Sequence, residues 1–333
     1  MALRAPKLTP EQLVQKMNDK NIRSEYKDAE EIKEYLSIHN NYFRTASYRC
    51  NYEKHIEGVK AGKYINLDFS YLTELATIDM YLRNLVLKMC LDIEHSLKVA
   101  LIADIAINDK EDGYTIVEQF INKNEYILTD IYYKSNSTYV GDLIKKYFEF
   151  EYSEDENGKK NIALKKNDCP VWAFMEIITF GDFTKFYSSY YELYPLGVNY
   201  TGVLNSVKSL RNACAHNNCI IHNLRKGSSK PTEKISQFVS SIPTISKSER
   251  KSVLSVRVVF ELTSLIYLYD KIVFEPVKKY GLMQLYDLFN NRMVKHKEYF
   301  EKQDIIKSAY KFLKKVVDFL IETTYNTNDN KKL

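Results

Sequence analysis

Glycine and proline are scarce in this sequence, with only ten Gly and seven Pro among 333 residues. The tight turns of hairpins and barrels depend on these residues, so their scarcity argues against an all-β fold. The hydrophobic fraction of 45% is large enough to fill a core, which excludes a disordered chain. We therefore expect an all-α fold of long helices joined by modest linkers.

Cysteines and long apolar runs are also few. The five cysteines are odd in number and suggest no disulfide framework, which points to a reducing compartment. The N-terminus lacks an apolar stretch of signal-peptide length, and the most apolar segments, 81–107 and 253–274, are interrupted by charges. We expect a cytoplasmic protein without a membrane partner.

Helical signals extend along most of the chain. Thr9 and Gln12 have capping-box spacing before the first helix, and apolar residues recur every three or four positions from Asp68 to about Ile107. Further helices are expected from about Tyr200, from Val253 to Val273 and near Asp304 to Thr323. The polar run at 151–161 is typical of an exposed loop.

The expected domain organisation has three parts. They are a small N-terminal helical extension (1–66), a multi-helix core with a variable insertion near 108–169 (67–325), and a disordered tail (326–333).

The segment "SLRNACAHNNC" from Ser209 to Cys219 combines several chemically active side chains. A metal site is one interpretation, because Cys and His are zinc ligands and four of them lie close together: Cys214, His216, Cys219 and His222. Their spacing does not match a zinc motif, and the cysteines fit the buried side of a helix. We predict no metal and no cofactor.

A catalytic interpretation fits the geometry better. On a helix, Asn212 and His216 are separated by four positions, so the amide can orient the imidazole, and Arg211 lies beside Asn212. RNA supplies its own nucleophile in the 2′-OH, so cleavage needs only a proton carrier and a cation for the phosphate. The alternative is that Arg211 and His216 cap the negative end of the helix, and the two interpretations stay open on these residues alone.

Charge is nearly balanced over the whole chain, with 48 basic and 43 acidic residues, but not around this segment. Residues 203–230 contain no Asp or Glu and five basic residues: Lys208, Arg211, Arg225, Lys226 and Lys230. The four besides Arg211 are expected to bind RNA phosphates.

Other polar residues are supporting candidates. Asp79, Arg83, Glu94 and Lys98 fall on one stripe of the long predicted helix. They either line the RNA site or form a solvated face with ion pairs four residues apart, and we favour the solvated face. Asn217 and His222 are candidates to extend the site.

The motif "RNACAHN" resembles the R-x4-6-H signature of the HEPN superfamily. Three further stretches are similar to the Abi family of bacterial abortive-infection proteins, of the AbiD/AbiF type: Leu36 to Arg49, Glu74 to Lys98 and Cys169 to Tyr187. Arg49 and His55 also fit the R-x4-6-H spacing, but without the Asn, and we interpret that match as chance.

The resemblance implies an all-α HEPN-type bundle and a metal-independent endoribonuclease that acts in phage defence or as a toxin. His216 would be the general acid and base, Arg211 the phosphate clamp and Asn212 the residue that orients the histidine. HEPN nucleases pair two such helices, so a homodimer is implied, and some AbiF-type relatives are restrained by a small structured RNA. The alternatives are a non-catalytic RNA-binding or adaptor HEPN protein, and a helical scaffold that senses a phage component.

Overall fold

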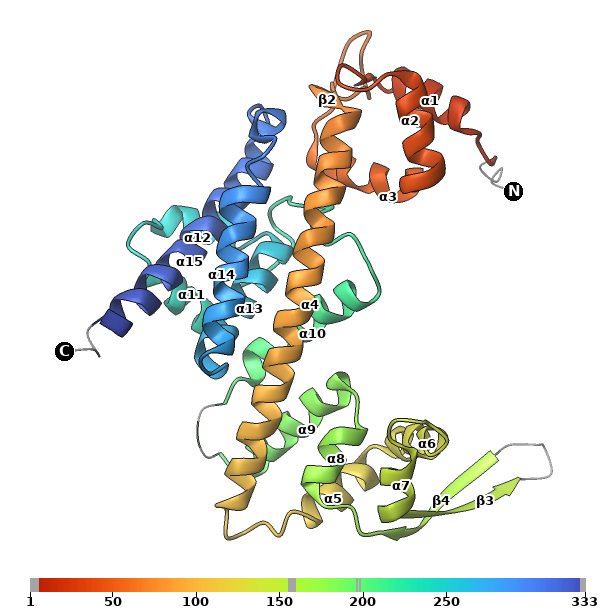
Figure 1. Cartoon of the computed structure of the whole chain (residues 1–333), viewed down its shortest axis with the longest axis vertical. Helices are drawn as coiled ribbons and strands as arrows, with labels where there is room; N and C mark the ends of the chain where they lie inside the picture. Colours follow the sequence, from red (N-terminus) through yellow and green to blue (C-terminus); the bar gives the residue numbers. More distant parts are fainter. Residues whose placement is uncertain (1–5, 155–159, 196, 198, 330–333) are drawn as a thin grey trace. The chain divides into compact units, whose positions relative to one another are not determined.

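The structure, a computed structural model, describes residues 6–154, 160–195, 197 and 199–329. The described residues are mainly helical and contain only two small two-stranded sheets, which confirms the all-α prediction (Figure 1). The chain forms two compact units. We call residues 1–92 and 209–333 the terminal unit and residues 93–208 the inserted unit. The helices α4 (Phe69–Ala106) and α10 (Thr201–Ala215) each pass from one unit to the other.

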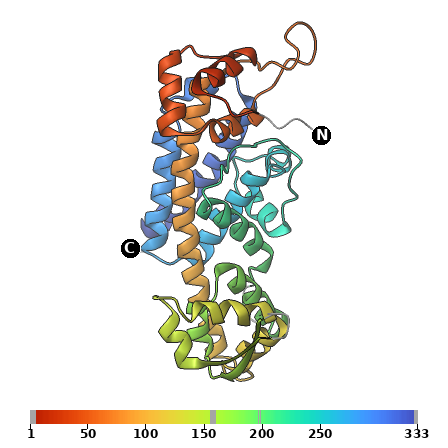
Figure 2. The same ribbon diagram turned by 90° about the vertical axis from the view of Figure 1, so that its right-hand side faces the viewer.

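The N-terminal part of the terminal unit contains α1 (Pro10–Asp19), α2 (Ala29–Glu34), α3 (Tyr42–Ser47) and the 3-10 helix η2 (Tyr48–Asn51), with the π-helical turn η1 (Tyr35–His39) between α2 and α3. The predicted capping box of α1 is present: Gln12 N–H donates to Thr9 Oγ1 at 3.3 Å and Thr9 N–H to Gln12 Oε1 at 2.9 Å. The short strands β1 (Ile22–Arg23) and β2 (Leu67–Asp68) pair in parallel and tie this part to the start of α4. Both views show it beside the first turns of α4 (Figures 1 and 2).

The C-terminal part of the terminal unit follows α10. Its helices are α11 (Glu233–Ser240), α12 (Lys247–Val253), α13 (Arg257–Ile272), α14 (Val277–Asp287) and α15 (Asp304–Asp329), with η3 (Leu288–Arg292) and η4 (Lys297–Phe300) before α15. Leu75, Ile78 and Leu82 of α4 are buried, and they line a cavity together with apolar residues of α13 and α15. The spacing of three or four residues puts these α4 side chains on one face of the helix.

Several C-terminal boundaries differ from the prediction. The helices α11, α12 and α14 were not predicted, and α13 begins four residues later than predicted. The last helix continues to Asp329, so 326–329 are helical rather than a disordered tail, and 330–333 lie outside the described residues.

The inserted unit contains the helices α5 (Thr115–Lys123), α6 (Glu125–Lys134), α7 (Gly141–Tyr147), α8 (Val171–Ile177) and α9 (Phe180–Leu193). Edge-to-face contacts of Phe120 with Phe174 and Phe186, at centroid distances of 6.1 and 5.0 Å, form its aromatic centre. The polar run that we predicted as a loop instead takes part in a hairpin of β3 (Phe148–Glu154) and β4 (Lys160–Asn167), and residues 155–159 of that run lie outside the described residues.

Among the described residues, no single helix is long and apolar enough to cross a membrane. The helices α12 and α13 reach that length and apolar composition only when they are counted together, and the chain bends by 111° between them.

Candidate functional site

The predicted motif lies at the C-terminal end of α10, and its backbone forms a Schellman turn. His216 N–H donates to the carbonyl of Asn212 at 3.0 Å, and the next two N–H groups, of Asn217 and Asn218, donate to the carbonyls of Cys214 at 2.9 Å and Ala213 at 2.8 Å. Asn217 has a φ of 56°, the left-handed conformation that such a turn requires and that Asn tolerates. Backbone groups therefore satisfy these terminal carbonyls, which need no cationic side chain as a cap.

The three predicted catalytic side chains differ in their surroundings. Asn212 and His216 are exposed, whereas Arg211 is half-buried and donates from Nη1 to Asn212 Oδ1 at 3.3 Å. Within the described residues, the imidazole of His216 makes no hydrogen bond or ion pair. The predicted bond from Asn212 to His216 is thus not formed here, and the Asn212 amide contacts Arg211 instead.

Asp79 in α4 is the buried centre behind this turn, with no exposed surface. Its Oδ1 accepts the backbone N–H groups of Ile220 at 3.0 Å and Ile221 at 2.9 Å. Its Oδ2 accepts the hydroxyl of Tyr48 at 2.9 Å and pairs with the guanidinium of Arg83. One buried charge is thereby balanced by a buried cation and three donors, as a carboxylate in an apolar interior requires.

These contacts correct the prediction of a solvated face. Asp79 and Arg83 are buried, and Asp79 holds the segment that follows α10, so the solvated-face interpretation is wrong for both residues. The expected pairing four residues apart is confirmed for Asp79 with Arg83 and for Glu94 with Lys98, where Lys98 Nζ lies 3.0 Å from Glu94 Oε1. Glu94 and Lys98 are half-buried and belong to the inserted unit, whereas the other pair belongs to the terminal unit.

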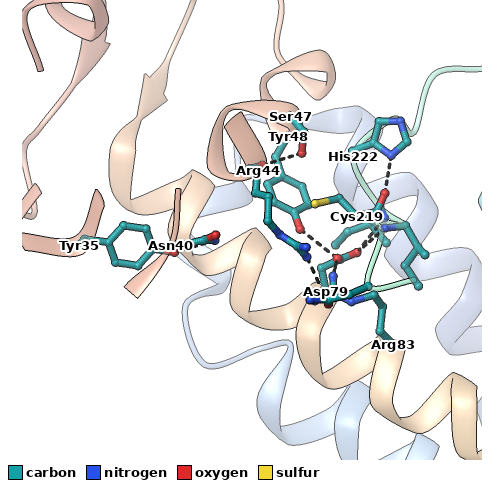
Figure 3. Close-up of polar contacts among 12 residues, drawn as sticks. Tyr35, Asn40, Arg44, Ser47, Tyr48, Asp79, Arg83, Cys219 and His222 are labelled. Carbon is teal, nitrogen blue, oxygen red and sulfur yellow. Dashed lines mark hydrogen bonds and ion pairs between the residues drawn. The ribbon is translucent and has the colours of Figure 1, made fainter. Parts of the chain in front are cut away.

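Figure 3 shows side chains of the N-terminal part converging on Asp79. Tyr48 points its hydroxyl at the carboxylate, and burial, followed by the contact with the Cys219 thiol, raises the pKa of Tyr48. Arg44 extends from α3 toward the same place and donates from Nη2 to Asn217 Oδ1 at 3.3 Å. The residue in the left-handed position of the turn is therefore held by its side chain as well as by its backbone.

Asn51 fixes the chain after the turn and was not predicted. Its buried amide donates from Nδ2 to the carbonyl of Ile221 at 3.0 Å and accepts the N–H of Leu224 at Oδ1 at 2.8 Å. His222 between them is exposed, and its Nδ1–H donates to the Cys219 carbonyl at 2.5 Å, so it stabilises the turn locally. Asp79 and Asn51 together hold residues 220–224.

The predicted RNA-binding residues are not equivalent in the structure. Arg225 donates from Nε to the Cys50 carbonyl at 2.8 Å and from Nη2 to the Tyr52 carbonyl at 3.2 Å, so its guanidinium anchors the loop. Lys226 and Lys230 are exposed, and within the described residues neither makes an ion pair. Lys208 is half-buried in α10 and is the last residue of the inserted unit.

The cysteines near the motif are part of the packing. Cys214 is buried, and that burial raises the pKa of its thiol to about 12. Cys219 is half-buried beside Tyr48. In the part of the chain that the structure describes, no three His, Cys, Asp or Glu residues are grouped so that they could hold a metal ion.

The fold and the site define a helical protein with an Arg-Asn-His motif at a helix end, in which a buried carboxylate holds the chain that follows the motif. The Abi-like protein family matches residues 34–222, which is more than half of the chain and includes Asp79, the end of α10 and His222. The chain belongs to this family, and membership suggests a part in abortive infection, a form of phage defence. Comparisons with curated proteins and with solved structures gave no match.

Proposed function

We propose that this chain is a metal-independent endoribonuclease of HEPN and AbiD/AbiF type, which acts in the cytoplasm in phage defence or as a toxin. The observation that carries the proposal is the end of α10. Arg211, Asn212 and His216 lie within two turns of one helix end, His216 is accessible, and the chain that follows them is held at Ile220 and Ile221 by the buried Asp79. A rigid support of this kind is what a catalytic group needs.

The proposed reaction uses the substrate's own hydroxyl. The imidazole of His216 accepts the proton of the 2′-OH, whose oxygen attacks the adjacent phosphorus, and the P–O5′ bond breaks. A second imidazolium returns a proton to the leaving 5′ oxygen, so the products are a 2′,3′-cyclic phosphate and a 5′-hydroxyl. Arg211 stabilises the charge on the pentavalent phosphorane. Asn212 holds the guanidinium in the free protein and orients the imidazole when RNA is bound.

The need for two imidazoles favours a homodimer. One chain has one complete motif, because the guanidinium of the second match, Arg49, is engaged inside the terminal unit. It donates to the Ala46 carbonyl at 2.8 Å and to the Tyr42 hydroxyl at 3.0 Å. In the proposed dimer the ends of two α10 helices face one phosphate. The exposed Lys226 and Lys230 bind the flanking RNA, and a small structured RNA that occupied this surface would restrain the enzyme.

The direct test is the chemistry of the cut ends. Purified protein, freed of bound RNA and supplied with a chelator, is expected to cut single-stranded RNA and leave 2′,3′-cyclic phosphate ends, detected by mass spectrometry. Cleavage that depends on a divalent ion and leaves 5′-phosphate ends would contradict the proposal. Binding without cleavage by the RNA-free protein would favour the non-catalytic HEPN alternative.

A further inference from the structure

The terminal unit contains a partly open apolar cavity of about 350 Å³ behind the segment that follows the motif. Leu75, Ile78 and Leu82 of α4 line one side, and Ala309 and Leu313 of α15 line another. These five side chains are all buried. A cavity of this size falls within the range of about 300–1,000 Å³ that is typical of small-molecule sites.

The mouth of this cavity is basic. Lys297 of η4 and Lys307 and Lys311 of α15 line it together with one acid, Glu301. Lys307 is already engaged, because its Nζ donates to the Glu301 carbonyl at 2.6 Å and pairs with Asp304 at 2.9 Å. Lys297 and Lys311 are exposed and make no ion pair within the described residues. Two ammonium groups are therefore available beside an apolar interior.

We propose that this cavity binds a single-chain aliphatic carboxylate, with its hydrocarbon chain inside and its carboxylate between Lys297 and Lys311. The apolar lining selects for the hydrocarbon, since burial of alkyl surface is favourable and the interior offers few polar partners. The unpaired lysines complement a negative head group. The volume suits one acyl chain better than the two chains of a phospholipid.

A bound acyl chain would also touch the support of the motif. Ile221 and Leu224 line the cavity, and these are the residues whose backbone groups are held by Asp79 and Asn51. Occupancy of the cavity would therefore change the freedom of residues 220–224 and, through them, of the turn at His216. This consequence rests on the proposed function, whereas the binding itself does not.

The experiment uses the full chain, freed of lipid, and titrates it calorimetrically with sodium decanoate and with decanol. We expect saturable binding of one decanoate per chain. The double variant Lys297→Ala/Lys311→Ala is expected to weaken decanoate binding by about tenfold and decanol binding by less than about twofold, because only the carboxylate uses the lysines. Lys302→Ala is the matched control, since Lys302 is exposed nearby but does not line the cavity.

A second variant tests the cavity itself. Ala309→Phe is expected to fill part of it and to abolish binding of both probes, with folding checked by circular dichroism. Absence of saturable decanoate binding by the wild type would overturn the proposal, as would a lysine variant that binds decanoate as the wild type does. Because His216→Ala leaves the cavity intact, it should bind decanoate normally, so failure of the nuclease proposal and failure of this one are distinguishable.

Discussion

The carboxylate of Asp79 in α4 accepts the backbone N–H of Ile221 at 2.9 Å, across 142 positions of sequence. This contact, with the matching one from Ile220, joins the first third of the long helix α4 to the chain just after the motif. The Arg-Asn-His motif, in which Asn212 and His216 are exposed and Arg211 is half-buried, is therefore followed by a segment that a buried ionic centre holds in place.

Asp79→Asn is predicted to destabilise the terminal unit by about 3 kcal/mol, because Arg83 would be left as a buried charge without its counter-ion. Urea unfolding followed by circular dichroism measures the free energy of unfolding, and hydrogen exchange of the peptide 216–224 should lose protection. Asp318→Asn is the control. It breaks a half-exposed pair with Lys314, also four residues apart, and is expected to cost less than about 1 kcal/mol. Equal effects of the two substitutions would contradict the role given to Asp79.

Pairing of two motifs predicts that an inactive variant lowers the activity of the wild type. Arg211→Ala and His216→Ala are each expected to be inactive alone, and co-expression or refolding of the wild type with an excess of His216→Ala should reduce the activity per wild-type chain in proportion to the wild-type fraction. The reason is that a mixed dimer contains only one of the two imidazoles that the proposed reaction needs. Rates of RNA cleavage by the separate and mixed proteins measure this effect. An unchanged activity per wild-type chain in a mixture shown to contain mixed dimers would argue that each chain works alone.

RNA affinity is predicted to depend on salt through Lys226 and Lys230. Each change to Ala should reduce the slope of log affinity against log salt by about 0.7 for single-stranded RNA, because one phosphate contact is lost. Fluorescence anisotropy with the His216→Ala protein avoids cleavage during the measurement. Lys60→Ala, an exposed lysine in the N-terminal part, should leave the slope unchanged. Arg225→Ala is a different case, since it also releases the loop from Cys50 and Tyr52.

The exposed Cys50 is predicted to react faster with thiol reagents than the buried cysteines do. Burial raises the pKa of both the Cys169 and the Cys214 thiols to about 12, from an ordinary value of 9.0, so both stay protonated near pH 8. Iodoacetamide should modify Cys50 first, as peptide mass spectrometry would show. The folded state holds these protons more tightly than the unfolded state, so stability should decline as the pH rises above about 9. Modification of Cys214 as fast as Cys50 would be incompatible with a buried thiol.

Much of the fold could be predicted from the sequence because its longest helices have a clear apolar period. Leu75, Ile78 and Leu82 are buried as their spacing indicates. The β3–β4 hairpin was missed although β3 alternates apolar residues (Phe148, Phe150 and Tyr152) with polar ones, because its strands are mostly exposed and overlap the polar run at 151–161. The short helices α11 and α12 carry few apolar residues, so their segments resemble a linker.

Of the candidate site, only the Arg-Asn-His motif could be predicted from the sequence. Arg211, Asn212 and His216 are neighbours in sequence, and helical spacing alone brings them to one helix end. The burial of Asp79 depends on Tyr48 and Ile221, which are distant along the chain, so its spacing on α4 gave no sign of it. Asn51 was missed for the same reason, since a lone Asn has no local signature of the backbone that it will bind.

The most direct test of the account compares His216→Ala with His55→Ala, the histidine of the second, chance match to the motif. Both proteins are purified free of RNA, checked for folding by circular dichroism, and assayed for cleavage of single-stranded RNA with a chelator present. His216→Ala is predicted to lose activity by about 100-fold or more while it still binds RNA, because the proton carrier is gone. His55→Ala should cut like the wild type. Cleavage by His216→Ala at the rate of His55→Ala would contradict the proposed nuclease site.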